Sequence, residues 1–133
     1  MQAIRREEDE TDERPTQAAS CDKPAARREE RAVELCECVI DIVAALYNVR
    51  SKELRQPGRA SFSVARVRQI AMYVAHVVCG LNMCEVGLGF GRDRTTVMHA
   101  CHLVEDLRDD EDFDRIIGQT ERVAQAALRR TRI

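Results

Sequence analysis

The chain has 133 residues, the length of one ordinary domain with a short extension. Aromatic residues make up only 4% and tryptophan is absent, so the core must be aliphatic, which suits small helices better than a sheet. The formal net charge of −2 excludes a chain that is polybasic throughout, but six arginines against four acids between Arg59 and Arg108 leave that segment locally positive.

The N-terminal segment, residues 1–27, is predicted to be a disordered acidic tail, because it is charged and polar, with almost no large apolar side chains. Its first twenty residues carry six acids against three arginines. Two roles remain open for it: none in particular, or repulsion of DNA from non-specific contact. No apolar segment follows Met1 and no run approaches a membrane span, so a cytoplasmic protein is expected.

The next elements are a helix over 28–49, a further helical turn over 51–54 and a connector through about Ser61. Residues at helical spacing give the first helix one apolar face, namely Leu35, Val39, Ile42, Val43, Leu46 and Val49. Gln56-Pro57-Gly58 breaks the helical pattern. The connector carries Arg55 and Arg59, which suit either a solvated loop or a contact with DNA.

A long helix is predicted over 63–79, with an apolar face of Val67, Ile70, Ala71, Val74, Val77 and Val78. Arg66, Arg68 and Gln69 cluster in its first turns. Positive charge at a helix N-terminus opposes the helix dipole, and such a local conflict indicates function rather than stability.

A helix-turn-helix is predicted at about 82–108. Asn82 and Glu85 form a capping box, and Gly87, Gly89 and Gly91 lie where that first helix is expected to end. The second helix, about 93–108, has an apolar face of Val97, Ala100, Cys101, Val104 and Leu107. Its start presents Arg94, Thr95 and Thr96 on the opposite side, which suits entry into a DNA major groove.

The residue types at this start match the chemistry of DNA. A threonine methyl can touch a thymine methyl, an arginine can pair bidentately with guanine, and an aspartate can accept from cytosine. Arg92, beside exposed helix-start amides, suits a phosphate. Asp93 can be a plain helix cap, a base contact, or both.

The last helix is predicted over 112–130, packed on the first helix, with one side formed by Phe113, Ile116, Ile117, Thr120, Ala124, Ala127 and Leu128. The same pattern would suit a dimer partner, so the oligomeric state stays open, with a monomer favoured. Residues 28–131 are thus expected to form one small helical bundle.

Other chemistries fit the sequence poorly. The six cysteines form no C-x-x-C pair, and His99, Cys101, His102 and Cys84 lack the spacing of a zinc site, so His99 and Cys101 are expected to be packing residues. The glycines at 87, 89 and 91 lack the spacing of a phosphate-binding loop. No set of residues is arranged for nucleophilic catalysis, so no enzyme, cofactor or metal is expected.

Three stretches together resemble the C-terminal DNA-binding domain of the replication initiator DnaA: Arg66-Val67-Arg68-Gln69-Ile70-Ala71-Met72-Tyr73-Val74-Ala75, Glu85-Val86-Gly87, and Phe90-Gly91-Arg92-Asp93-Arg94-Thr95-Thr96-Val97-Met98-His99-Ala100. The resemblance runs from about Leu35 to about Asp110. It implies an all-helical, Trp-repressor-like fold that recognises the DnaA box in double-stranded DNA through a helix-turn-helix and a basic loop. The DNA contacts that it implies are Arg59, Arg66, Arg68, Gln69, Arg92, Asp93, Arg94, Thr95 and Thr96, of which Arg66 is equally well explained by a structural role.

The chain departs from that family at several positions. Ala60 and Phe62 stand where basic residues are expected, Arg94 replaces a usual histidine, and one glycine fewer separates Phe90 from Arg92. The nucleotide-binding ATPase module of DnaA is not expected here. The resulting hypothesis is a regulator of replication initiation or transcription that acts by occupying DNA sites. The alternative is a protein-interaction module that keeps the fold without tight DNA binding.

Overall fold

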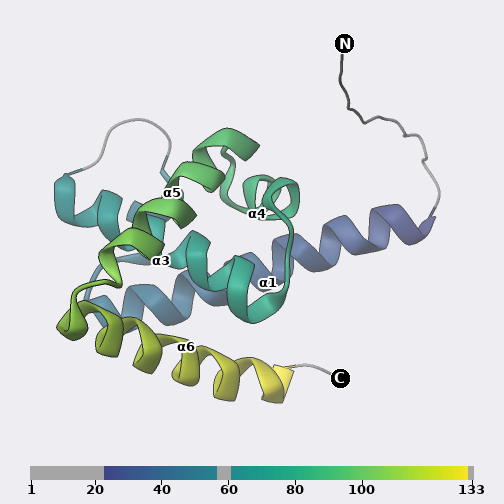
Figure 1. Cartoon of the computed structure of the whole chain (residues 1–133). Coiled ribbons are helices and arrows are strands. Elements are labelled where there is room, and N and C mark those ends of the chain that lie inside the picture. The colour runs from purple at the N-terminus through teal and green to yellow at the C-terminus, as the bar shows by residue number, and fades with distance from the viewer. Residues whose placement is uncertain (1–22, 57–60, 132–133) are drawn as a thin grey trace, which may run out of the picture. The chain divides into compact units, whose positions relative to one another are not determined.

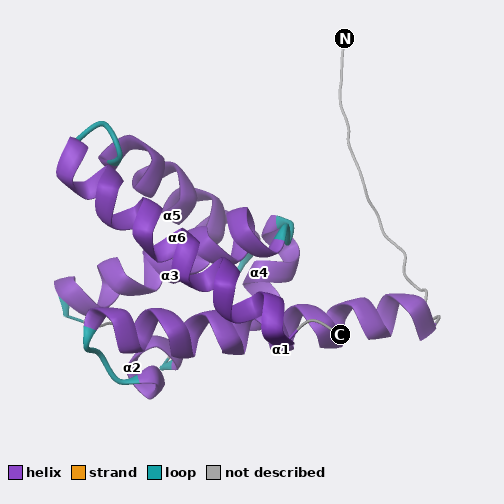
Figure 2. Cartoon of the chain, turned by 90° about the horizontal axis from the view of Figure 1, so that it is seen from below, coloured by secondary structure: helices purple, strands orange, loops and turns teal. Residues whose placement is uncertain are grey.

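Helices build the fold of this chain. The computed structural model describes residues 23–56 and 61–131, which form six helices and no strand (Figures 1 and 2). They are α1 (Lys23–Tyr47), α2 (Ser51–Arg55), α3 (Phe62–Cys79), α4 (Met83–Phe90), α5 (Arg94–Leu107) and α6 (Glu111–Thr131). The prediction of an all-α fold is confirmed.

Helix α1 begins earlier than expected, at Lys23 instead of about Arg28. Pro24 lies in its first turn, where the missing amide hydrogen costs nothing because that position has no partner within the helix. Residues 1–22, the rest of the predicted acidic tail, lie outside the described residues. The chain divides into two units at Arg31 and Ala32, and the second unit, 32–133, contains the predicted helix-turn-helix.

Local side-chain caps start the helices around the predicted helix-turn-helix. The Asn82 side chain accepts from the Glu85 amide at 2.8 Å, and the Asn82 amide donates to the Glu85 carboxylate at 2.9 Å, so the predicted capping box is confirmed. Ser61 caps α3 by accepting from the amide of Val64 at 3.3 Å. These bonds join residues three apart and therefore depend on local sequence alone.

Helix α3 is the central element, because it contacts α2, α4, α5 and α6 (Figure 1). Every residue from Val67 to Ala75 except Gln69 is buried, and a helix that is covered on nearly all sides must be apolar nearly all round. Its partners contribute the buried side chains Leu54, Val86, Phe90, Val97, Val104 and Ile117. Helix α6 packs on α3, and Tyr47 of α1 and Thr120 of α6 share a hydrogen bond of 2.8 Å.

The periodic patterns placed most of the core correctly, with three exceptions. Leu46, Val77 and Ile116 were assigned to apolar faces, but they are 47%, 47% and 46% exposed. Leu46 and Ile116 both line a surface pocket shared by α1 and α6, so these helices cover them only in part. In α5 the predicted face is confirmed, since Val97, Ala100, Cys101 and Val104 are buried. No helix in the described part of the chain is long and apolar enough to cross a membrane.

Candidate nucleic-acid interface

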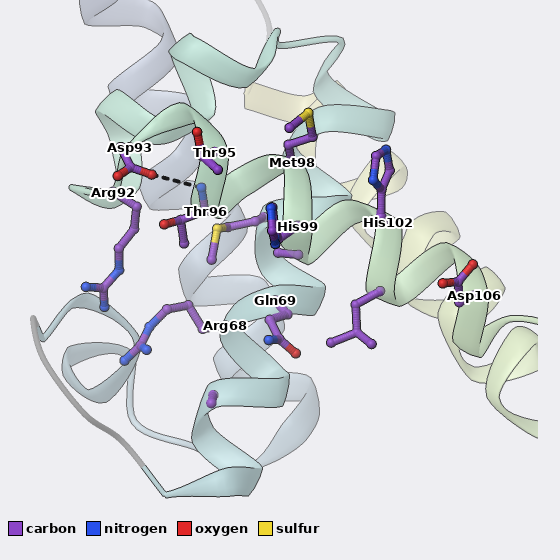
Figure 3. Close-up of a pocket in the computed structure, with 14 residues that line it drawn as sticks. Arg68, Gln69, Arg92, Asp93, Thr95, Thr96, Met98, His99, His102 and Asp106 are labelled. Carbon is purple, nitrogen blue, oxygen red and sulfur yellow. Dashed lines mark hydrogen bonds between the residues drawn. The ribbon is translucent and has the colours of Figure 1, made fainter.

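The start of α5 presents polar side chains to solvent. Asp93 accepts a hydrogen bond from the Thr96 amide at 2.8 Å and caps the helix, as predicted (Figure 3). This backbone hydrogen bond, with one from the Thr96 side chain, lowers the pKa of Asp93 from its ordinary value. Arg94, Thr95 and Thr96 are exposed, whereas Val97 behind them is fully buried. The buried face of α5 therefore anchors the helix, while these three side chains point toward solvent.

The turn before α5 differs from the predicted one. Helix α4 continues through Gly87 and Gly89 as far as Phe90, and only Gly91 ends it, with φ of 67° in the left-handed region. The expectation that all three glycines mark the helix end was therefore wrong for the first two. The Arg92 amide closes this end by donating to the Gly87 carbonyl at 2.9 Å.

Close packing explains the two glycines inside α4. A Cβ on Gly87 would lie 2.6 Å from the backbone oxygen of Arg92 in the turn. A Cβ on Gly89 would overlap the side chain of Cys36 on α1. Both positions thus require the smallest residue because another segment occupies the space. Gly87 lets α4 and the following turn approach closely, and Gly89 lets α4 approach α1.

A groove runs between α3 and α5 (Figure 3). Its walls include most of the predicted contact residues, together with side chains that were not predicted. The lining residues are Ala65, Arg68, Gln69, Met72, Arg92, Asp93, Thr95, Thr96, Met98, His99, Ala100, His102, Leu103 and Asp106. The fold thus brings Gln69 of α3 to the same concave surface as the capped start of α5.

His99 was expected to be a packing residue, but it is exposed on this groove. The signal that could have placed it is helical spacing, because His99 follows Thr96 by three residues and Thr95 by four. His102, one further turn along, lies on the groove as well. Cys101 is buried, as expected.

Arg68 has a structural role that the sequence did not indicate. Its side chain is 8% exposed, and its guanidinium donates to the carbonyls of Leu54 and Glu53, each at 3.0 Å, and of Gln56 at 3.4 Å. These carbonyls lie at the C-terminal end of α2, where the helix itself offers no donors. Burial, and then the nearby charge of Arg92, lower the pKa of Arg68. Arg68 thus ties α3 to α2, and the DNA contact that the resemblance implies for it stays a prediction.

Arg92 approaches the same place from the turn before α5. Its guanidinium donates to the Gln56 carbonyl at 2.8 Å, so Arg92 and Arg68 share one acceptor at the start of the connector. Figure 3 shows the two arginine side chains extending toward the same place. Arg92 remains partly exposed, which leaves its charge on the groove. The carbonyl end of α2, with its negative partial charge, offsets the repulsion between the two cations.

The remaining predicted contacts lie at the N-terminal end of α3 and before it. The Arg66 guanidinium carbon lies 5.0 Å from the centre of the Phe62 ring, a cation–π arrangement. Gln69 is partly buried on the groove wall. Arg59, the predicted contact in the connector, and Ala60 lie outside the described residues.

The buried thiols of this unit have little nucleophilic character. Burial raises the pKa of Cys36 to about 12 and that of Cys101 to about 11, so both remain protonated near neutral pH. Among the described residues, no group of three or more histidine, cysteine, aspartate or glutamate side chains is placed to hold a metal ion. The groove combines the cations of Arg68 and Arg92 and the carboxylates of Asp93 and Asp106 with hydroxyl, amide and imidazole groups.

Solved structures of replication initiators share this fold. A DNA replication initiation factor matches with a TM-score of 0.69 and 28% identity, over 77% of this chain and 32% of that one. The replication initiator DnaA bound to AMPPCP and single-stranded DNA matches with a TM-score of 0.65 and 26% identity, over 80% and 33%. AMPPCP-bound DnaA from Aquifex aeolicus gives 0.62 and 26%, over 79% and 31%. The chain thus spans about a third of the length of these proteins.

The family model for the bacterial DnaA protein helix-turn-helix matches residues 36–104. This range begins in α1 and ends in α5, so it contains the capped turn and nearly the whole groove. From its sequence, its fold and these matches, the chain belongs to the family of bacterial DnaA helix-turn-helix domains, which are DNA-binding domains.

Proposed function

We propose that this protein binds double-stranded DNA at specific sequences and regulates replication initiation or transcription by occupying those sites. The observation that carries the proposal is the start of α5. Arg94, Thr95 and Thr96 project from a helix whose opposite face is buried, so they can enter a major groove without disturbing the core.

The arginines on either side of the α5 cap support a duplex as the partner. Arg92 and Arg94 flank the cap of α5, and Gln69 of α3 lines the same groove as Arg92. Side chains on α3 and α5 together allow the protein to contact phosphates and bases of one duplex. Phosphate contacts set the register of the protein on DNA, and base contacts set the sequence preference. The sites that we propose are similar to DnaA boxes, with a base preference altered by Arg94.

We further propose that this DNA-binding unit acts by binding rather than catalysis, and that site occupancy needs no nucleotide-driven step. A protein of this kind competes for sites, or marks them, at a level set by its own concentration and affinity. Its action would then depend on the location of its sites relative to an origin or a promoter. We also propose a cytoplasmic location, since this is where such sites are accessible in a bacterium.

The test is selection from random duplexes with the full chain, followed by gel-shift titration of a selected and a scrambled duplex. Enrichment of one motif would support the proposal. The binding constant should also fall as salt rises, with a slope of log K against log salt of about −0.9 for each phosphate contacted. Recovery of no motif, with no tight binding to random duplexes, would contradict it and favour a protein-interaction module.

A further inference from the structure

The N-terminal end of α3 carries an aromatic side chain that the fold leaves uncovered. Phe62 is 76% exposed, more than any other large hydrophobic residue in the described part of the chain. Ser61 caps the helix immediately before it, so the Phe62 backbone has a defined position. A single exposed apolar residue is common on protein surfaces, and its surroundings must therefore decide whether it has a role.

Arg66 restrains this ring from one helical turn away. Its guanidinium lies over the ring, with 5.0 Å between the guanidinium carbon and the ring centre, which limits rotation of the side chain. The Nε of Arg66 is buried and has no acceptor among the described residues. Stacking on Phe62 thus keeps a cation beside an exposed apolar surface.

Phe62 is aligned with the groove between α3 and α5. Ala65 and Gln69, which line that groove, follow Phe62 by three and seven residues, so all three lie on one side of α3. One helical turn is about 5.4 Å long, which makes Phe62 the next position of the α3 wall beyond Ala65. The ring therefore extends the proposed DNA surface toward the connector.

We propose that Phe62 is an apolar DNA contact, whose ring packs on the deoxyribose and base edges of the same duplex that α5 binds. This inference rests on the proposed function. Sugars and base edges give DNA apolar surface between its phosphates, and proteins use phenylalanine against such surface. The adjoining Arg66 favours a polyanion over an apolar protein partner.

The experiment compares Phe62→Ala, Phe62→Leu and Val77→Ala in the full chain on the duplex that the wild type selects. Val77 is the matched control, because it is an exposed apolar residue at the other end of the same helix. Binding constants are measured across a range of salt concentrations, and melting curves verify that each variant is folded.

We expect Phe62→Ala to weaken binding about tenfold, which corresponds to partial burial of one phenyl ring. The slope of log K against log salt should stay unchanged, because no charge is removed. Phe62→Leu should lose less than Phe62→Ala, since it keeps apolar surface, and Val77→Ala should bind as wild type does.

Two results would overturn the inference while leaving the proposed function intact. In one, Phe62→Ala binds the selected duplex as tightly as wild type. In the other, the slope of log K against log salt for Phe62→Ala becomes shallower by the amount expected for about one lost phosphate contact. That would mean that the ring acts only by positioning Arg66. Failure of the wild type to select any duplex is a separate result, and it would overturn the proposed function together with this inference.

Discussion

At its N-terminal end α5 presents Arg94 to solvent, with no hydrogen bond or ion pair to any described residue, whereas Arg108 at its C-terminal end is surrounded by partners. Arg108 donates to Asp114 at 2.5 Å, to Glu121 at 2.9 Å and to the Tyr73 hydroxyl at 3.1 Å. Its guanidinium carbon also lies 5.8 Å from the centre of the Tyr73 ring.

The same residue type therefore serves stability at one end of the helix and is available for a ligand at the other. Burial acts to lower the pKa of Arg108, but the hydrogen bonds to Asp114, Tyr73 and Glu121 outweigh it and raise that pKa. The network joins α3, α5 and α6, and so fixes the axis along which the start of α5 projects. Counting arginines cannot separate these roles, because the partners are distant in sequence.

The largest effect is expected at the C-terminal end of α5. Arg108→Ala should lower the free energy of unfolding by about 3 kcal/mol, because it leaves Glu121 and the Tyr73 hydroxyl without their cation. Arg115→Ala is the control, since its ion pair with Asp112 is exposed and should contribute well under about 1 kcal/mol. Urea unfolding of the two variants would measure both. Equal losses would contradict the stabilising role of Arg108.

A second substitution acts on the turn between α4 and α5, which positions the N-terminal end of α5. Gly87→Ala should destabilise by roughly 2–3 kcal/mol, because the added Cβ meets a backbone oxygen of Arg92 that cannot move aside alone. Binding to the selected duplex should weaken as well, since the turn shifts.

Gly118→Ala on α6 is the matched control. Its Cβ would meet nothing closer than a flexible arginine side-chain atom at 3.6 Å, so alanine should stabilise by up to about 1 kcal/mol. Thermal melts of both variants give the comparison. A stable Gly87→Ala variant would show that close packing does not set this turn.

Substitutions at the exposed start of α5 should separate binding from stability. Arg94→Ala and Thr95→Ala should each cost roughly 1–3 kcal/mol of specific DNA binding. Their stability should change by no more than about 0.5 kcal/mol, because both side chains are exposed. The measurements are binding curves on a selected and a scrambled duplex, together with melting curves.

Val97→Ala is the opposite case, because its side chain is fully buried and its loss leaves a void in the core. It should lower the melting temperature, while the folded fraction still binds DNA. Wild-type affinity in both Arg94→Ala and Thr95→Ala would remove α5 from the proposed interface.

The smallest effect concerns pH. Asp93 has a folded-state pKa below its ordinary value of about 3.9, so its cap stabilises the fold above that pH. This contribution is lost as pH falls through the lowered folded-state pKa. Asp93→Asn keeps a cap without the titrating group. The melting temperatures of the variant and the wild type should therefore depend on pH in the same way above about pH 4 and differently only below it. Parallel profiles down to about pH 2 would contradict a role for the charged cap.

The glycine cluster shows where sequence patterns fall short. Gly91 was placed at a helix end and does adopt positive φ there. Gly87 and Gly89 were given the same reason, but they lie inside α4 because Arg92 and Cys36 occupy the space beside them. A glycine needed for its conformation and one needed for its size look alike in a sequence.

Arg68 gives the same lesson for a charged residue. Its position near a helix start suggested a ligand, yet the groups that satisfy it are carbonyls on α2 and just after it, twelve to fifteen residues away. His99 shows the reverse, since it was assigned to packing but is exposed on the groove beside Thr96. In both cases the sequence did not reveal a neighbour from another helix or the surface that such neighbours leave open.

The sequence by itself determined the helices, their caps at Asn82 and Asp93, the buried face of α5 and the outward display of Arg94 and Thr95. These features arise from interactions between residues three or four apart, which any single helix already contains. Only the tertiary structure decided which arginines are held by other helices, which glycines are needed for size, and how α3 and α5 form one groove. Those outcomes depend on contacts between residues far apart in the chain, where close packing leaves room for one arrangement.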